Sequence, residues 1–199
     1  METRQTMPTP FLIIDLEATC WEGGGHPGEN EIIEIGCAIV DSANAMLWSG
    51  GWFVKPVINP VLSEFCTKLT SITQDEVTNA LRFPEAMNLL KQQVKETTGT
   101  ALAECFFVSW GNYDRRQFEK DCARHQIPYP FGPHINLKVE FSHKFSIKKH
   151  GVARALAKLG LDFQGTLHRG ADDAKNIARI FTQEFEPRYP FRTILRPGD

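Results

Sequence analysis

The sequence predicts a single α/β domain built on a sheet that contains both antiparallel and parallel strands. Two strongly apolar segments, residues 11–14 and 105–110, are typical of buried central strands. A long helical segment separates them, so the second strand can run parallel to the first. Short connections join the first strand to the next two, which favours an antiparallel meander. A chain of 199 residues is long enough for one such domain with a real core.

Five strands are expected, each supported by alternating or continuous apolar character. In the second strand Ile33, Ile35 and Cys37 share one face. The third strand ends before Pro56, and the fifth has the weakest pattern. The expected strands begin at residue 11 and then span 31–40, 48–55, 105–110 and 135–141.

Helices fill the intervals between and after these strands. Residues 59–79 alternate capping residues with short apolar patches, which indicates two short helices. Residues 84–95 carry an apolar stripe at helical spacing, with Pro84 near the start. Further helices are expected at 115–126, 149–159 and about 171–185. We place the domain at 11–186, between an N-terminal tail at 1–10 and an irregular, Pro/Arg-rich tail at 187–199.

The composition indicates a cytoplasmic protein without a membrane partner. No apolar run approaches the roughly 20 residues that span a bilayer, and residues 1–10 lack the apolar segment of a signal peptide. The five cysteines are odd in number, widely scattered and without a C-x-x-C pair, so we interpret them as reduced core residues. The sequence makes no prediction of oligomeric state.

Charge is distributed unevenly along the chain although the net charge is only −2. Residues 5–54 contain seven acidic residues and no Lys or Arg, whereas 138–154 contain five basic residues and one acidic residue. An acidic site for cations together with a basic segment for phosphates suits a nucleic-acid enzyme. On charge alone, two solvated faces of opposite sign are an equally good interpretation.

Asp15 and Glu17 interrupt the first apolar strand. Because side chains alternate across a strand, both carboxylates project from the same face. Two like charges on a buried strand repel each other, and one would be protonated unless a cation lay between them. For the pair alone, a strand end in solvent is the better interpretation. The rest of the chain must supply partners for a cation.

Two later segments supply such partners. Asp114 follows the second apolar strand and would lie beside Asp15 and Glu17 if the two strands are neighbours. Taken alone, Asp114 is better interpreted as the N-cap of a helix. Asp173 shares a helical face with apolar residues, whereas Asp172 shares its face with Lys175, Asn176 and Arg179, which we expect to be solvated. An aspartate at the head of an apolar stripe needs a partner, so Asp173 is the better ligand candidate.

His168 lies just before that helix and is a candidate general base, because its ordinary pKa is near working pH. An isolated histidine in such a place is more often a plain surface residue. Four carboxylates and one histidine match a two-metal hydrolytic site, and oxygen ligands select Mg²⁺ or Mn²⁺ over zinc. Two such ions about 4 Å apart can support in-line attack of water on a phosphodiester.

These motifs resemble those of the DnaQ-like, DEDDh family of 3′→5′ exonucleases, and the resemblance runs from about residue 11 to 185. It is closest to the branch of histone-mRNA 3′-end exonucleases and KapD-like proteins. The segments that carry this closer resemblance are 15–21 (Asp-Leu-Glu-Ala-Thr-Cys-Trp), 31–34 (Glu-Ile-Ile-Glu), 59–72 (Asn-Pro-Val-Leu-Ser-Glu-Phe-Cys-Thr-Lys-Leu-Thr-Ser-Ile) and 170–179 (Gly-Ala-Asp-Asp-Ala-Lys-Asn-Ile-Ala-Arg). Two departures, an expanded loop at 23–25 and Ser71 in place of a common glycine, leave the preferred substrate end open.

The resemblance implies an RNase H-like fold, with a mixed five-stranded sheet flanked by helices. It implies hydrolysis of phosphodiester bonds at single-stranded 3′ ends, with RNA favoured over DNA and 5′-mononucleotides as products. Two Mg²⁺ ions, for which Mn²⁺ can substitute, would be bound by Asp15, Glu17, Asp114 and Asp173, with Glu17 touching both ions. His168 would deprotonate the attacking water. The implied substrate contacts are Glu17, the backbone at Ala18 and Thr19, Ile72 wedged against the terminal base, and His168.

Two other functions fit parts of the pattern. A haloacid-dehalogenase-type phosphatase also places an acid-x-acid motif after a buried strand and an Asp pair late in the chain. It would need Asp in place of Glu17 and a catalytic Lys in place of His168. A catalytically silent RNA-binding module would be indicated by a broken motif, and all five residues are present.

Overall fold

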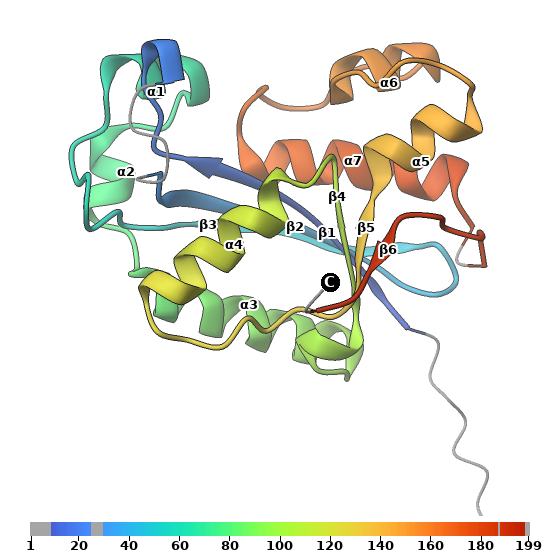
Figure 1. Ribbon diagram of the computed structural model, residues 1–199, viewed down its shortest axis with the longest axis horizontal. Helices are drawn as coiled ribbons and strands as arrows, with labels where there is room; N and C mark the ends of the chain where they lie inside the picture. The colour runs from blue at the N-terminus through green and yellow to red at the C-terminus, as the bar shows by residue number, and fades with distance from the viewer. Residues whose placement is uncertain (1–8, 25–29, 187, 198–199) are drawn as a thin grey trace, which may run out of the picture.

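A mixed sheet with the strand order β3-β2-β1-β4-β5-β6 forms the centre of the domain (Figure 1). The computed structural model describes residues 9–24, 30–186 and 188–197. The strands are β1 (Phe11–Ala18), β2 (Ile32–Val40), β3 (Met46–Phe53), β4 (Phe106–Ser109), β5 (His134–Asn136) and β6 (Ile194–Leu195). The helices are α1 (Glu64–Thr70), α2 (Gln74–Thr78), α3 (Phe83–Thr98), α4 (Tyr113–Arg124), α5 (Leu137–Lys144), α6 (Val152–Lys158) and α7 (Gly170–Glu184), with 3₁₀ turns η1 (Glu22–Gly24) and η2 (Leu102–Glu104).

The pairing of the strands confirms the predicted mixture of directions. β1, β2 and β3 form the antiparallel meander, and β4 lies beside β1 in parallel. β5 continues the sheet parallel to β4, and β6 closes it antiparallel to β5. The carboxyl ends of β1 and β4 therefore lie at the same edge of the sheet. Polar residues that follow these two strands are brought together at that edge.

Two strands in the C-terminal half of the chain, β5 and β6, differ from the prediction. The strand expected at 135–141 is only three residues long, because α5 begins at Leu137 and the Asn136 side chain caps it by accepting a hydrogen bond from Val139 N at 3.2 Å. The sheet also has six described strands rather than five. The additional strand, β6, is held next to β5 because the buried Glu140 carboxylate accepts hydrogen bonds from the backbone N–H groups of Arg192 and Thr193.

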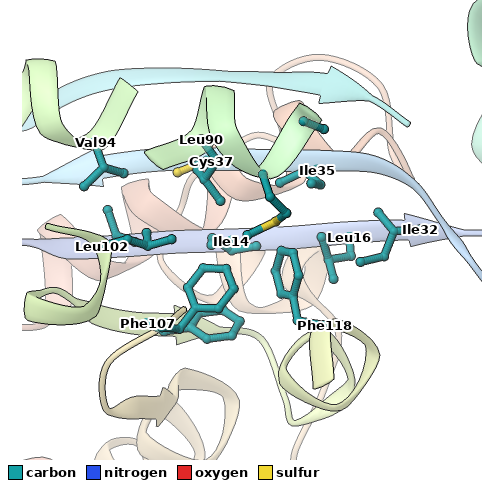
Figure 2. Close-up of a cluster of buried hydrophobic side chains, with 14 of the residues drawn as sticks. Ile14, Leu16, Ile32, Ile35, Cys37, Leu90, Val94, Leu102, Phe107 and Phe118 are labelled. Atoms are coloured by element: carbon teal, nitrogen blue, oxygen red, sulfur yellow. The ribbon is translucent and has the colours of Figure 1, made fainter. Parts of the chain in front are cut away.

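Two layers of helices cover the sheet. α3 and α4 pack on one face, and α5, α6 and α7 pack on the other (Figure 1). Leu12, Ile14 and Leu16 of β1 belong to the core under α3 and α4, part of which is shown in Figure 2. Phe11 and Ile13 belong to the core under α7. By the alternation of the strand, Asp15 and Glu17 therefore face the α7 side.

The N-terminus of α7 lies unusually close to β2. A Cβ atom added at Gly36 would lie 1.9 Å from the backbone of Gly170. Only glycine allows this approach, which brings the first turn of α7 against the sheet beside β1. The close packing places Asp173, in that first turn, next to the end of β1.

Several sequence expectations fall on residues that the structure does not describe. Residues 1–8 and 25–29, including Gly25 of the expanded loop at 23–25, are outside the described residues, as are 187, 198 and 199. Among the described residues, no helix combines the length and apolar character needed to cross a bilayer.

Candidate active site

Three carboxylates meet at the carboxyl end of β1. One oxygen from each of Asp15, Glu17 and Asp173 lies within 4.8 Å of the other two. Asp15 and Glu17 are half-buried and Asp173 is buried, so the solvated strand end considered for the D-x-E pair does not describe this site. Of the two adjacent aspartates, Asp173 belongs to this cluster, which is the arrangement that the helical-face argument favours.

Asp114 joins the site from the neighbouring strand–helix connection. Its side chain is 4% exposed, and its Oδ1 accepts a hydrogen bond from Leu16 N at 3.1 Å. β1 pairs with β4 only as far as Ile13, so the Leu16 N–H is available on the open side of the strand. The N-cap interpretation is wrong, because Asn112 holds the N-cap of α4 and Asp114 lies within its first turn. Asp114 thus lies beside the strand segment that carries Asp15 and Glu17.

The pKa of each of the four carboxylates is raised above its ordinary value. Burial, with repulsion from Asp114 and Asp173, raises the pKa of Asp15 well above its ordinary range. Burial and repulsion from Asp173 and Glu34 raise the pKa of Glu17 to about 9. Burial raises the pKa of Asp114 and the pKa of Asp173 to about 6, against opposing backbone hydrogen bonds. A cluster that resists ionisation in this way is one that a bound cation would stabilise.

The donor set fits divalent magnesium or manganese. It consists of carboxylate oxygens from β1, α4 and α7, and hard cations of this type prefer such oxygen ligands. No cysteine or imidazole belongs to the group of converging ligand atoms among the described residues. The residues present therefore suit a divalent cation.

His168 reaches the site through its backbone. It is exposed, with the positive φ of 59° that non-glycine residues rarely adopt, and its N–H donates to Asp173 Oδ2 at 2.8 Å. The proximity of His168 acts against the rise in the pKa of Asp173. The predicted base is thus held next to a predicted metal ligand, on the loop that leads into α7.

Glu34 is a site residue whose role the strand pattern did not reveal. It lies opposite Glu17 in the β1–β2 ladder, and its buried carboxylate accepts hydrogen bonds from Gly170 N at 3.0 Å and Ala171 N at 3.2 Å. Arg169 Nε lies 3.5 Å from the same carboxylate. Glu34 therefore anchors the N-terminus of α7, and with it Asp173. The available signal was a glutamate within a strand that is otherwise apolar, since a buried charge requires partners.

The other predicted substrate contacts, Ala18, Thr19 and Ile72, are less accessible to a substrate. Thr19 is buried, its N–H donates to Glu31 O at 2.9 Å and its Oγ1 accepts from Glu31 N at 3.0 Å. Ala18 O accepts a hydrogen bond from the Cys66 thiol at 3.7 Å. Ile72 is 0% exposed and packs in a small core with Leu62, Cys66 and Val77, among others. The structure thus brings the backbone of 18–19 close to the site but keeps the Ile72 side chain away from the surface.

One expectation about the outer face of α7 is wrong. Asn176, expected to be solvated, is fully buried. Its amide pairs with the backbone of Gln164 in the loop before the helix. The apolar periodicity of α7 was visible in the sequence, whereas a loop folded over its polar face was not.

Comparisons with known proteins agree with this geometry. The family model described as Exonuclease (RNase_T) matches residues 12–181. The chain is 34% identical over 177 residues to "3′-5′ exoribonuclease 1" of Rattus norvegicus, covering 85% of this chain and 51% of the relative. It is 31% identical over 189 residues to "ERI1 exoribonuclease 2" of Mus musculus, covering 85% of this chain and 28% of the relative. The chain thus spans about half or less of the length of these relatives.

A solved structure extends the similarity to the whole domain. The nuclease domain of 3′hExo, described as a DEDDh family member bound to rAMP, superposes with a TM-score of 0.85 at 29% identity. The match covers 96% of this chain and 98% of that domain. The resemblance that the motifs predicted is confirmed, and a haloacid-dehalogenase-type phosphatase is excluded. The fold, the carboxylate cluster and the family match together show that this chain belongs to the exonuclease (RNase_T) family.

Proposed function

We propose that the chain is a divalent-metal-dependent 3′→5′ exonuclease that trims single-stranded 3′ ends and releases 5′-mononucleotides. The observation that carries this proposal is the convergence of Asp15, Glu17 and Asp173, with Asp114 alongside, at one edge of the sheet. RNA is favoured over DNA as the substrate. Support for this choice comes from the exoribonuclease names of the relatives and from the rAMP bound to the similar nuclease domain.

Asp15, Glu17, Asp114 and Asp173 would hold two Mg²⁺ ions, for which Mn²⁺ can substitute. Bound there, the ions would supply activation of water and stabilisation of the leaving oxygen of a phosphodiester. The protein fixes the ligands in advance: Asp114 is held by Leu16 N, and Asp173 is held by His168 N. Such preorganisation reduces the rearrangement required when cations and substrate bind.

His168 is the proposed general base. Its exposure leaves the imidazole accessible to solvent and substrate, and its backbone bond keeps it beside Asp173. A neutral imidazole in this position can accept the proton of the attacking water, whereas the surrounding carboxylates would be occupied by cations. After bond cleavage the new 5′-phosphate leaves with the terminal nucleotide.

A basic loop beside the site is the proposed contact for the nucleic-acid backbone. Trp110, directly after β4, donates from Nε1 to His150 O at 2.8 Å. This bond ties the α5–α6 loop to the edge of the sheet that bears Asp114. Lys148 and Lys149 in that loop are exposed, so their ammonium groups can approach the phosphates of a strand that enters the site.

The proposal includes a cytoplasmic location, based on the scattered free cysteines.

The test of substrate class uses 5′-labelled single-stranded RNA and DNA oligomers of the same sequence, each with Mg²⁺, with Mn²⁺ and with EDTA. We expect metal-dependent shortening of both, faster for RNA. Faster trimming of DNA would contradict the choice of substrate, and binding without cleavage in either metal would favour the silent RNA-binding module instead.

A further inference from the structure

The loop that carries His168 is tied to α7 at every second residue. Residues 159–169 connect α6 to α7, and backbone groups at 162, 164, 166 and 168 each bond to an α7 side chain. The pairs are Arg179 Nη1 to Asp162 O at 2.7 Å, Asn176 with Gln164, Thr166 N to Asp172 Oδ2 at 2.8 Å, and His168 N to Asp173 Oδ2 at 2.8 Å. Polar side chains of α7 thus support the loop along its length.

Asn176 is the most completely engaged of these side chains. Its Oδ1 accepts from Gln164 N at 3.1 Å and from Arg179 Nη1 at 2.8 Å. Its Nδ2 donates to Gln164 O and to Asp172 O, both at 2.8 Å. Asn176 itself is 0% exposed, so its amide depends on these partners rather than on water. A buried amide with both ends satisfied specifies one orientation of its partners.

His168 depends on such support because its own contacts are few. Its side chain is exposed, and its positive φ is a conformation that costs a non-glycine residue free energy. Gly165, also at a positive φ of 94°, lies against the Asp172 carboxylate, where a Cβ would come within 2.3 Å of it. The loop path into His168 is therefore set by its attachment to α7.

We propose that Asn176 is a positioning residue for His168, acting through its two hydrogen bonds to the backbone of Gln164. The inference rests on the proposed function, in which His168 is the general base. In this assignment, Asn176 touches neither the carboxylate oxygens of the metal ligands nor the substrate. Its effect is to hold the loop in register along α7, so that the imidazole is presented beside Asp173 in each catalytic cycle.

The central test is Asn176→Ala in the full chain. Because the base would be misplaced while the carboxylates remain, we expect kcat for RNA trimming to fall roughly 10- to 100-fold. KM should stay within about threefold. The Kd for Mn²⁺, measured by calorimetry, should change much less than kcat, because Glu34 still anchors the N-terminus of α7 even where the bond from His168 N to Asp173 loosens. Hydrogen exchange at the Gln164 amide should accelerate roughly fivefold or more. Arg179→Ala, at a less buried position, should lower kcat in the same way but by only about threefold.

Glu140→Ala is the matched control. Glu140 is also buried and also holds the backbone of another segment, at Arg192 and Thr193, but it does so beside β5. This variant should lose stability without a change in kcat or in exchange at Gln164. An equal loss of kcat in Glu140→Ala, or unchanged kcat in a folded Asn176→Ala, would overturn the inference. A loss of Mn²⁺ affinity in Asn176→Ala as large as its loss of kcat would overturn it too.

If the proposed function is wrong, the same experiments give different results from those expected if only the role of Asn176 is wrong. A wild-type protein without nuclease activity, or His168→Ala with wild-type activity, would remove the role assigned to His168. Accelerated exchange at Gln164 in Asn176→Ala would still show that Asn176 holds the loop. Unchanged exchange would show that it does not, whatever the activity of the wild type.

Discussion

Glu17 and Glu34 lie directly opposite each other on β1 and β2, yet their carboxylates serve different purposes. Glu34 turns to the N-terminus of α7 and accepts hydrogen bonds from Gly170 N and Ala171 N. Glu17 converges with Asp15 and Asp173. The two residues form one cross-strand pair, but of the two carboxylates only that of Glu34 has hydrogen-bond donors from the protein among the described residues. The partner that Glu17 requires is the cation proposed above.

Glu34→Gln tests the structural half of this relationship. The change removes the charge that faces Arg169 and one of two acceptor oxygens, so the free energy of unfolding should fall by about 1–2 kcal/mol. Urea denaturation measures this change. Glu76→Gln removes the charge of the more exposed partner of Arg169. This variant should change the free energy of unfolding by less than about 0.5 kcal/mol. Equal effects of the two variants would show that Glu34 does not anchor α7.

The adjacent aspartates of α7 should differ sharply. Asp173→Asn removes a carboxylate from the cluster, and we expect a loss of activity of roughly a thousandfold. Asp172→Asn keeps an oxygen that can accept from Thr166 N, so activity should stay within about threefold of wild type. Initial rates on a labelled RNA measure both. Greater loss in Asp172→Asn than in Asp173→Asn would refute the assignment of the ligand.

The stability of the metal-free protein should fall as pH rises through the titration of Glu17. Its pKa is about 9 in the folded state and near 4.5 when unfolded, so the folded state binds more protons between these values. The contribution is fully present below about pH 4.5 and is lost as pH rises through about 9. Thermal melts in EDTA at pH 7 and pH 9 measure this loss, with Glu17→Gln as the comparison. The fall should be smaller in Glu17→Gln, and an equal fall in both proteins would contradict the prediction.

Divalent metal should reverse that trend. Cations bind ionised carboxylates, so Mg²⁺ should raise the melting temperature more at pH 9 than at pH 7, with release of protons on binding. Melts with and without Mg²⁺ at both pH values measure the difference. Asp15→Asn serves as the control and should show a reduced response to the metal. A wild-type response independent of pH would argue against a site made of these carboxylates.

The lysines of the α5–α6 loop should contribute mainly to binding. For Lys148→Ala/Lys149→Ala we expect a higher KM with kcat within about twofold, and a slope of log affinity against log salt that is lower by roughly 1 to 1.5. Binding to a labelled RNA at several salt concentrations measures the slope. The matched control is Lys91→Ala/Lys95→Ala on α3, which covers the opposite face of the sheet. A similar slope change in that control would indicate a general charge effect.

Local patterns in the sequence predicted most of the fold and favoured the grouping of Asp15, Glu17 and Asp173 that the structure shows. Alternation in β1 placed Asp15 and Glu17 on one face, and the apolar stripe of α7 selected Asp173 over Asp172. Both inferences depend on periodicity within one element. The parallel pairing of β4 with β1 followed from the length of the connection, and it brought Asp114 to the same edge.

What the sequence did not reveal depends on contacts between segments that are distant along the chain. Asn176 looks solvated on a helical wheel, and only the loop before α7 covers it. Ile72 was assigned to a base through a resemblance, whereas the structure buries it among Leu62, Cys66 and Val77. β6 exists because Glu140 binds the backbone of a segment about fifty residues later, a pairing without a local pattern.

The most direct test of the central claim is a time course of a 5′-labelled single-stranded RNA incubated with wild-type protein and with Asp15→Ala in the presence of Mg²⁺. For the wild type we predict a ladder that shortens one nucleotide at a time from the 3′ end and stops when EDTA is added. Asp15→Ala should leave the RNA intact. Internal cleavage products, or trimming by Asp15→Ala at the wild-type rate, would contradict the proposal that these carboxylates form the catalytic site of a 3′→5′ exonuclease.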